Sequence, residues 1–170
     1  MEQTHELKVV SIRLVDEPPL FSSSQLTSPK EVFELMGREL QTYDRELFCV
    51  LNLRTNNQVI NMNVVSVGTL NTALAHPREV FKSAILSNAD GIILLHNHPS
   101  GSCAPSREDC LITKRLMAAG ELMGIPVRDH VIVAGSDYYS FLENENIIKK
   151  EQNYVENVAE KTMPEKERTR

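Results

Sequence analysis

The chain has 170 residues, of which 41% are hydrophobic, so its length and composition predict one globular domain with an ordinary apolar core. A formal net charge of -5, with 5% aromatic residues and no Trp, argues against a broad nucleic-acid surface, which needs clustered Lys and Arg and aromatic stacking platforms. The start of the chain lacks the features of a signal peptide, the sequence has no long apolar run, and three cysteines without paired spacing fit a reducing compartment, so we expect a cytoplasmic protein without a membrane span.

The N-terminal part is expected to hold one strand, one connector and one helix. Residues 7–14 alternate loosely between apolar and polar and predict a strand, whereas residues 16–27 are rich in Pro and Ser and predict a connector. At residues 28–31, Ser-Pro-Lys-Glu fits a helix capping box with Pro at the first helical position. The apolar residues that follow, as far as Leu40, have helical spacing.

A hairpin and a second helix are predicted next. Residues 46–53 and 59–67 favour two strands, and the polar segment at residues 55–57 favours the turn between them. His76 and Pro77 open a helix whose core face is expected to carry Val80, Phe81, Ala84 and Ile85.

The C-terminal half begins with residues 91–95, a continuous apolar run typical of a central strand buried on both faces. Ser106 is expected to begin a helix that ends at Gly124, with an apolar core face made by Leu111, Ile112, Leu116, Ala119, Leu122 and Met123. Strands are expected at residues 127–133 and 138–142, followed by a charged, solvated tail.

The mixture of hairpins with alternating strands and helices predicts an α/β fold, a three-layer α/β/α sandwich around a mixed sheet. We expect three parts along the chain: an N-terminal strand and connector at residues 1–27, the main domain at residues 28–150, and a charged tail at residues 151–170.

His96, His98 and Asp109 are the strongest candidates for a functional site. Residues i and i+2 of a strand point to the same face, so the two imidazoles can be aimed at one point, and the Pro-containing loop that follows can bring the aspartate back to them. Two imidazoles and one carboxylate leave a coordination position open on a metal ion, which is the pattern of catalytic rather than structural zinc. The ligand types favour zinc over manganese or iron.

Structural interpretations compete with these functional ones. Ser106 can be a helix N-cap with Asp109 as its reciprocal partner, a role that would compete with metal binding for the Asp109 carboxylate. His130, next to Asp129, is either a residue that supports a metal ligand or a residue flanking a strand. Cys103 lies in the loop between the ligands and is interpreted as incidental, and His76 is expected to help start its helix.

The segment from His96 to Asp109 resembles the JAMM (MPN+) motif of zinc isopeptidases. The motif consists of His-x-His-Pro, ten residues between His98 and Asp109, and Ser106 three residues before that aspartate. HNHPSG at residues 96–101, HPREVF at 76–81 and RDHVIVAG at 128–135 resemble the RadC family more narrowly. The similarity covers about residues 28–142, and the chain is similar to a short form that lacks the family's helix-hairpin-helix module, of the kind found on mobile elements.

The resemblance implies one Zn²⁺ per chain, held by His96, His98 and Asp109. It also implies a glutamate at the start of a nearby strand as the general base, for which Glu46 is the best positional match and Glu79 the second candidate. Ser106 would donate a hydrogen bond to the oxyanion. Glu46 can also be interpreted as a solvated charge at a strand end.

The sequence therefore leaves two hypotheses for the function. The first is a zinc-dependent metallohydrolase that cleaves a peptide or isopeptide bond in an unidentified peptide or protein substrate. The alternative is a non-catalytic zinc-binding interaction module associated with DNA repair, recombination or mobile elements, although the acidic net charge makes direct DNA binding doubtful. A two-metal nuclease and a nucleobase deaminase are disfavoured, because the additional carboxylates and the Pro-Cys-x-x-Cys segment that they need are missing.

Overall fold

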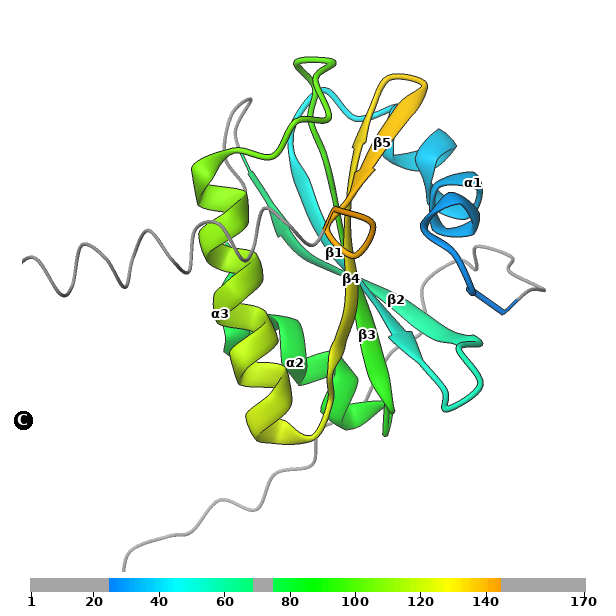
Figure 1. The fold of residues 1–170 in the computed structure, drawn as a ribbon, viewed down its shortest axis with the longest axis vertical. Helices are drawn as coiled ribbons and strands as arrows, with labels where there is room; N and C mark the ends of the chain where they lie inside the picture. The colour runs from blue at the N-terminus through cyan, green and yellow to red at the C-terminus, as the bar shows by residue number, and fades with distance from the viewer. Residues whose placement is uncertain (1–24, 69–74, 145–170) are drawn as a thin grey trace, which may run out of the picture.

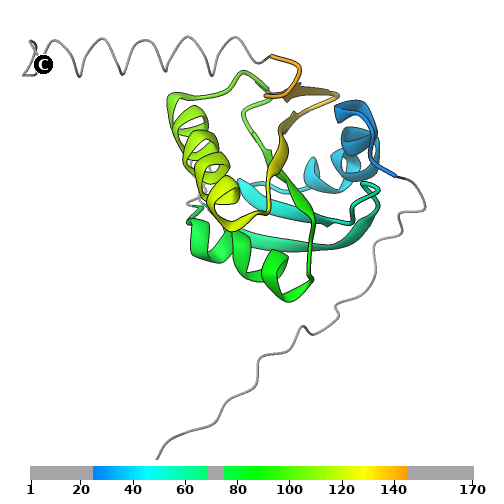
Figure 2. The ribbon, with the colours of Figure 1, turned by 60° about the horizontal axis from the view of Figure 1, so that its bottom comes forward.

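The computed structural model describes residues 25–68 and 75–144. Within these residues, five strands form one mixed sheet in the order β2-β1-β3-β4-β5, with α1 on one face and α2 and α3 on the other (Figure 1, Figure 2). This arrangement confirms the three-layer α/β/α sandwich. The strand expected at residues 7–14, most of the connector and the charged tail lie outside the described residues. The elements are α1 (Pro29–Leu40), β1 (Leu47–Leu53), β2 (Val59–Val67), α2 (Pro77–Leu86), β3 (Gly91–Asn97), α3 (Arg107–Met123), β4 (Val127–Ala134) and β5 (Asp137–Ser140).

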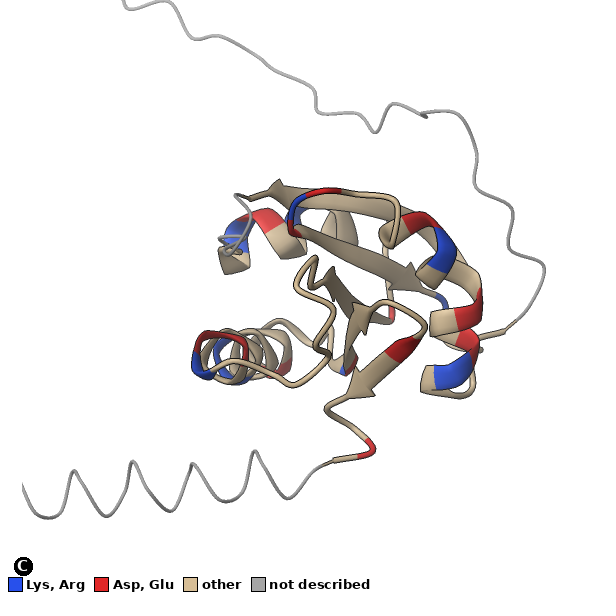
Figure 3. Ribbon diagram, turned by 90° about the horizontal axis from the view of Figure 1, so that it is seen from above, with Lys and Arg blue, Asp and Glu red and all other residues tan. Residues whose placement is uncertain are grey.

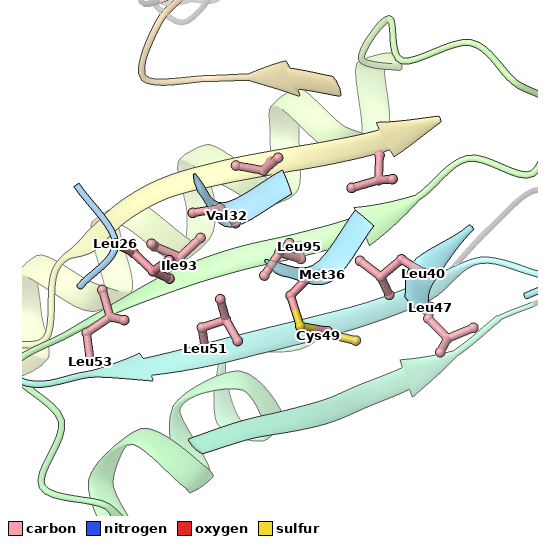
Figure 4. Close-up of a cluster of buried hydrophobic side chains, with 12 residues drawn as sticks. Leu26, Val32, Met36, Leu40, Leu47, Cys49, Leu51, Leu53, Ile93 and Leu95 are labelled. Carbon is pink, nitrogen blue, oxygen red and sulfur yellow. The ribbon is translucent and has the colours of Figure 1, made fainter. Parts of the chain in front are cut away.

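The N-terminal helix α1 begins at the predicted capping box. The Ser28 hydroxyl accepts a hydrogen bond from the Glu31 backbone N–H, and the Glu31 carboxylate accepts one from the Ser28 backbone N–H. The apolar side of α1 then covers one face of the sheet, as Figure 4 shows for Val32, Met36 and Leu40. Burial of this apolar surface stabilises the layer by roughly 25 cal/mol for each Å² removed from water.

Strand β3 lies at the centre of the sheet and positions the candidate site. It pairs antiparallel with β1 and parallel with β4, and α3 forms the crossover between the two parallel strands. Every residue of β3 is buried, as expected of a strand covered on both faces. The register with β1 places Phe48 opposite His96, so these two side chains point to the α2/α3 face of the sheet.

The predicted core faces of α2 and α3 were wrong in part. Ile85 is 56% exposed and Leu122 is 89% exposed, although both were expected in the core. Leu111 and Met123 were expected there too, and both are exposed. Small or polar residues instead bring α3 close to the sheet, because its buried side includes Thr113 and Gly120. An apolar pattern cannot reveal a contact that depends on side chains being small.

Replacing Gly120 by Ala is expected to destabilise the fold by about 1–3 kcal/mol, although Ala has the higher helix propensity. A Cβ atom at this position would lie 2.6 Å from the Ile125 carbonyl oxygen, a backbone atom that cannot rotate away. Chemical denaturation measures the free energy of unfolding of the parent protein and of the variant. Gly37→Ala is the matched control, because its new Cβ would meet the Phe33 ring at 2.8 Å, and that side chain can move. A Gly120→Ala protein that is more stable than the parent would contradict the close approach.

Candidate metal centre

The structure brings His96, His98 and Asp109 together at the end of the central strand. His96 is the sixth residue of β3, His98 follows the strand, and Asp109 lies in the first turn of α3. The intervening loop at the upper end of the sheet in Figure 1 contains Gly101 in a left-handed conformation at φ 82°, as expected of a permissive turn residue. One ligand atom from each of the three side chains lies within 4.8 Å of the others, so the group could hold a metal ion.

The facing atoms are spaced as ligands of one small cation would be. His96 Nε2 lies 2.9 Å from His98 Nε2 and 3.2 Å from Asp109 Oδ1, and His98 Nε2 lies 3.4 Å from Asp109 Oδ2. Two atoms bound to one tetrahedral zinc ion at its usual bond lengths lie about 3.3 Å apart. His98 Nδ1 lies 2.7 Å from the carbonyl oxygen of Ser102, which can only accept, so this nitrogen carries a proton. When its ring is neutral, His98 therefore presents the lone pair of Nε2 to the site.

Charge interactions within the group hold the Asp109 carboxylate ionised. Burial alone would raise the pKa of Asp109, but the hydrogen bonds and charges of His96 and His98 hold that pKa well below its usual range. Burial alone would lower the pKa of His98, but Asp109, the Ser102 carbonyl and the charge of Glu46 raise it. The anionic carboxylate and two ring nitrogens form a donor set that suits a borderline-soft divalent cation.

Asp109 also completes the cap of α3, so its carboxylate serves both the helix cap and the candidate metal site. Oδ2 accepts hydrogen bonds from the Ser106 backbone N–H at 2.7 Å and from the Ser106 hydroxyl at 2.6 Å, whereas Oδ1 is the atom nearer to His96. The Ser106 hydroxyl in turn accepts from the Asp109 backbone N–H at 3.1 Å. The predicted capping box is confirmed. Oδ2 serves both the cap and the candidate site, because it also lies 3.4 Å from His98 Nε2, whereas the cap does not use Oδ1, which lies 3.2 Å from His96 Nε2.

Of the two candidate glutamates, Glu46 lies next to the site. It directly precedes β1, two residues before Phe48, and the alternation of an extended chain puts it on the same face as His96. Its charge acts on His98, as noted above. Glu79 lies in the first turn of α2, where it forms ion pairs with Lys82 and Arg78.

Asn97 holds the segment that carries Glu46, and sequence reasoning missed it. Its side-chain Oδ1 accepts from the Leu47 backbone N–H at 2.7 Å, and its Nδ2 donates to the Arg45 carbonyl oxygen at 3.0 Å. The backbone on both sides of Glu46 is thereby bonded to one side chain. The available signal was the presence of an amide in a strand buried on both faces, because a buried amide requires partners.

The ring of His130 contacts the candidate ligand His96, whereas Asp129 bonds the backbone of His130. His130 Nε2 lies 2.8 Å from His96 Nδ1, and the ring packs between Phe48 and Phe141. Burial lowers the pKa of His130 well below its usual value. The Asp129 carboxylate accepts from the backbone N–H of His130 at 2.7 Å.

The described residues His76, Cys49 and Cys103 lie outside the candidate metal group. His76 is the N-cap of α2, where its Nδ1 accepts from the Arg78 backbone N–H at 3.2 Å, as predicted. Cys49 is a core residue of β1, and burial raises the pKa of its thiol to about 12. Cys103 is partly exposed in the loop and is not a member of the three-residue group.

An α/β/α sandwich with two histidines and an aspartate at the end of its central strand defines a domain with a candidate metal site. The profile of the RadC-like JAB domain family matches residues 26–147, and the chain belongs to this family.

Several relatives match most of the chain. The chain is 42% identical over 135 residues to a UPF0758 protein of Methanosarcina mazei, a match that covers 79% of this chain and 57% of the relative. It is 48% identical over 118 residues to a UPF0758 protein of Desulfitobacterium hafniense, which covers 69% of this chain and 52% of the relative. A third relative, a UPF0758 protein of Moorella thermoacetica, is 46% identical over 127 residues, with 75% and 55% covered. The chain thus spans a little over half the length of these relatives.

Proposed function

We propose that the protein is a zinc-dependent hydrolase of peptide or isopeptide bonds. The observation that carries the proposal is the convergence of three side chains on one point, with Glu46 beside them. Two ring nitrogens and a carboxylate oxygen would hold a zinc ion and leave it a coordination position for solvent or substrate. The JAB family of the chain agrees with this type of site.

Each residue of the site has a role in the proposed reaction. His96, His98 and Asp109 would hold the ion, which supplies Lewis-acid chemistry by acidifying water and polarising a carbonyl group. Glu46 would accept a proton from the attacking water and deliver it to the leaving amine. Asn97 would keep the segment of Glu46 in place through its two backbone hydrogen bonds.

Ser106 has one hydroxyl hydrogen, and Asp109 accepts it in this structure. The proposed donation to an oxyanion therefore requires the Ser106 hydroxyl to turn from Asp109 toward the substrate. The capping bond from the Asp109 backbone N–H can remain, because it uses a lone pair of the hydroxyl oxygen.

Direct DNA binding receives no support from the distribution of charge. Lys and Arg are interspersed with Asp and Glu on the described helices, as Figure 3 shows, whereas phosphate recognition favours clustered positive charge. Among the described residues, no helix combines the length and apolar character needed to cross a bilayer. The proposed partner is a peptide or protein substrate.

Purified protein loaded with zinc is expected to cleave members of a mixed peptide library, which mass spectrometry detects as new amino and carboxyl termini. Removal of the ion with a chelator should abolish the cleavage, and zinc should restore it, because the proposed reaction needs its Lewis acid. Cleavage that persists after chelation, or a zinc-loaded protein that cleaves neither library peptides nor proteins of a cell extract, would contradict the proposal.

A further inference from the structure

We propose that Thr113 and His130 are positioning residues that set the protonation pattern of the His96 ring, so that Nε2 is always the nitrogen offered to the metal. The inference deepens the proposed function, since it assumes that His96 binds a metal ion. It does not assume that the protein hydrolyses anything. It rests on a continuous chain of hydrogen bonds that starts at the backbone of α3 and ends at the candidate ligand.

The first link fixes the direction of the Thr113 hydroxyl. Its Oγ lies 2.5 Å from the carbonyl oxygen of Asp109, one turn earlier in α3, and 2.6 Å from His130 Nδ1. A carbonyl oxygen can only accept, so the single hydroxyl hydrogen goes to Asp109. The Thr113 oxygen must then accept at its other contact, and the proton between Thr113 and His130 belongs to Nδ1 of the imidazole.

The second link passes this assignment to His96. His130 is 1% exposed and lies among aromatic rings, an environment that favours the neutral imidazole. With its proton on Nδ1, the neutral ring of His130 has its lone pair on Nε2, which lies 2.8 Å from His96 Nδ1. His96 must therefore donate from Nδ1. Its own lone pair is then on Nε2, the atom that faces His98 and Asp109.

Aromatic packing keeps the rings from turning out of this arrangement. Phe141 stacks on His130 with ring centroids 5.1 Å apart and planes 9° apart, and Phe48 stacks on His96 at 5.8 Å and 10°. Rotated rings would therefore lose both the stacking and the hydrogen bonds. Metal-binding histidines commonly donate their second ring N–H to an oxygen acceptor, and here a neutral imidazole serves as that acceptor.

This series of hydrogen bonds also connects two of the candidate ligands to one helix, α3. Asp109 and Thr113 are four residues apart on α3, so they lie on the same side of the helix. Asp109 contributes a carboxylate directly, and Thr113 orients His96 on β3 through His130 on β4. The position of α3 thus determines both the third ligand and the orientation of the first.

Thr113→Val tests the proposal, because valine keeps the branched shape and removes the acceptor for His130 Nδ1. We expect zinc affinity, measured by competition with a chromophoric chelator, to fall about 10–100-fold, as is typical for the loss of such supporting contacts. Thr113→Ser should restore affinity to within about threefold, since it returns the hydroxyl. Thr42→Val is the matched control, because its hydroxyl bonds the Glu39 carbonyl on α1, outside the site; it should leave affinity unchanged.

Nitrogen-15 NMR of the histidine rings in the metal-free parent protein at neutral to mildly basic pH gives a second readout that needs neither a variant nor turnover. We expect His96 and His130 each to carry the ring proton on Nδ1. A proton on Nε2 of neutral His96, or a folded Thr113→Val protein with parental zinc affinity, would overturn the proposal. If the parent binds zinc with the expected ring form but cleaves no peptide, the proposed hydrolase fails and the positioning role stands.

Discussion

Glu46→Gln is expected to slow peptide cleavage by about 10²–10⁴-fold, the usual contribution of a general acid–base residue. Glutamine has nearly the same shape as glutamate but cannot accept a proton from water at neutral pH. The substitution leaves the three candidate ligands in place, so zinc content should remain at one ion per chain. Cleavage rates at equal protein concentration and elemental analysis of the same samples measure the two quantities.

Glu79→Gln is the matched control for this experiment. Glu79 forms ion pairs with Lys82 and Arg78 on α2, and these pairs are exposed, so the substitution should leave cleavage within about twofold of the parent. In cells, peptide termini that depend on the protein should disappear with Glu46→Gln and persist with Glu79→Gln. The assignment of the general base to Glu46 is wrong if the two variants lose activity equally, or if only Glu79→Gln does.

His98→Ala is expected to abolish both zinc retention and hydrolysis. The substitution removes one of three ligands from a site that offers a metal ion no fourth protein ligand within the described group, and the two remaining side chains would hold zinc weakly. Zinc retained after dialysis is measured by elemental analysis, together with cleavage of the peptides that the parent protein cuts. Undiminished zinc in this variant would falsify the ligand assignment.

The control for His98→Ala is His76→Ala. His76 caps α2 with its imidazole, so its loss is expected to lower the free energy of unfolding by about 0.5–2 kcal/mol without altering zinc content. Comparison of the two variants separates loss of a histidine from loss of a ligand. Circular dichroism of His98→Ala should match that of the metal-free parent protein, because His98 follows β3 and is not part of the core.

Local signals in the sequence predicted the elements and the meeting of His96, His98 and Asp109. The capping boxes at Ser28 and Ser106 gave the starts of α1 and α3, and the alternation of a strand aligned the two histidines. These features depend on residues that are close along the chain. They could therefore be inferred without knowledge of the packing.

The surroundings of the site could not be predicted in the same way. Thr113 and His130 meet only because α3 crosses back over the parallel β3–β4 pair, and Asn97 reaches Leu47 only because β1 pairs with β3. The exposure of Leu122 likewise depends on which side of α3 faces the sheet. The contacts of Thr113 and Asn97 join different elements of the fold, so a helical or strand period carries no information about them.

The bonds of Asn97 have a mechanical consequence. His96 and His98 point to one side of β3, while the residue between them is fastened to the backbone that flanks Glu46. These two bonds couple the backbone beside Glu46, the proposed proton acceptor, to the end of β3 that carries the two imidazoles. A displacement of this end of β3 would be transmitted to the backbone beside Glu46 through the same two hydrogen bonds.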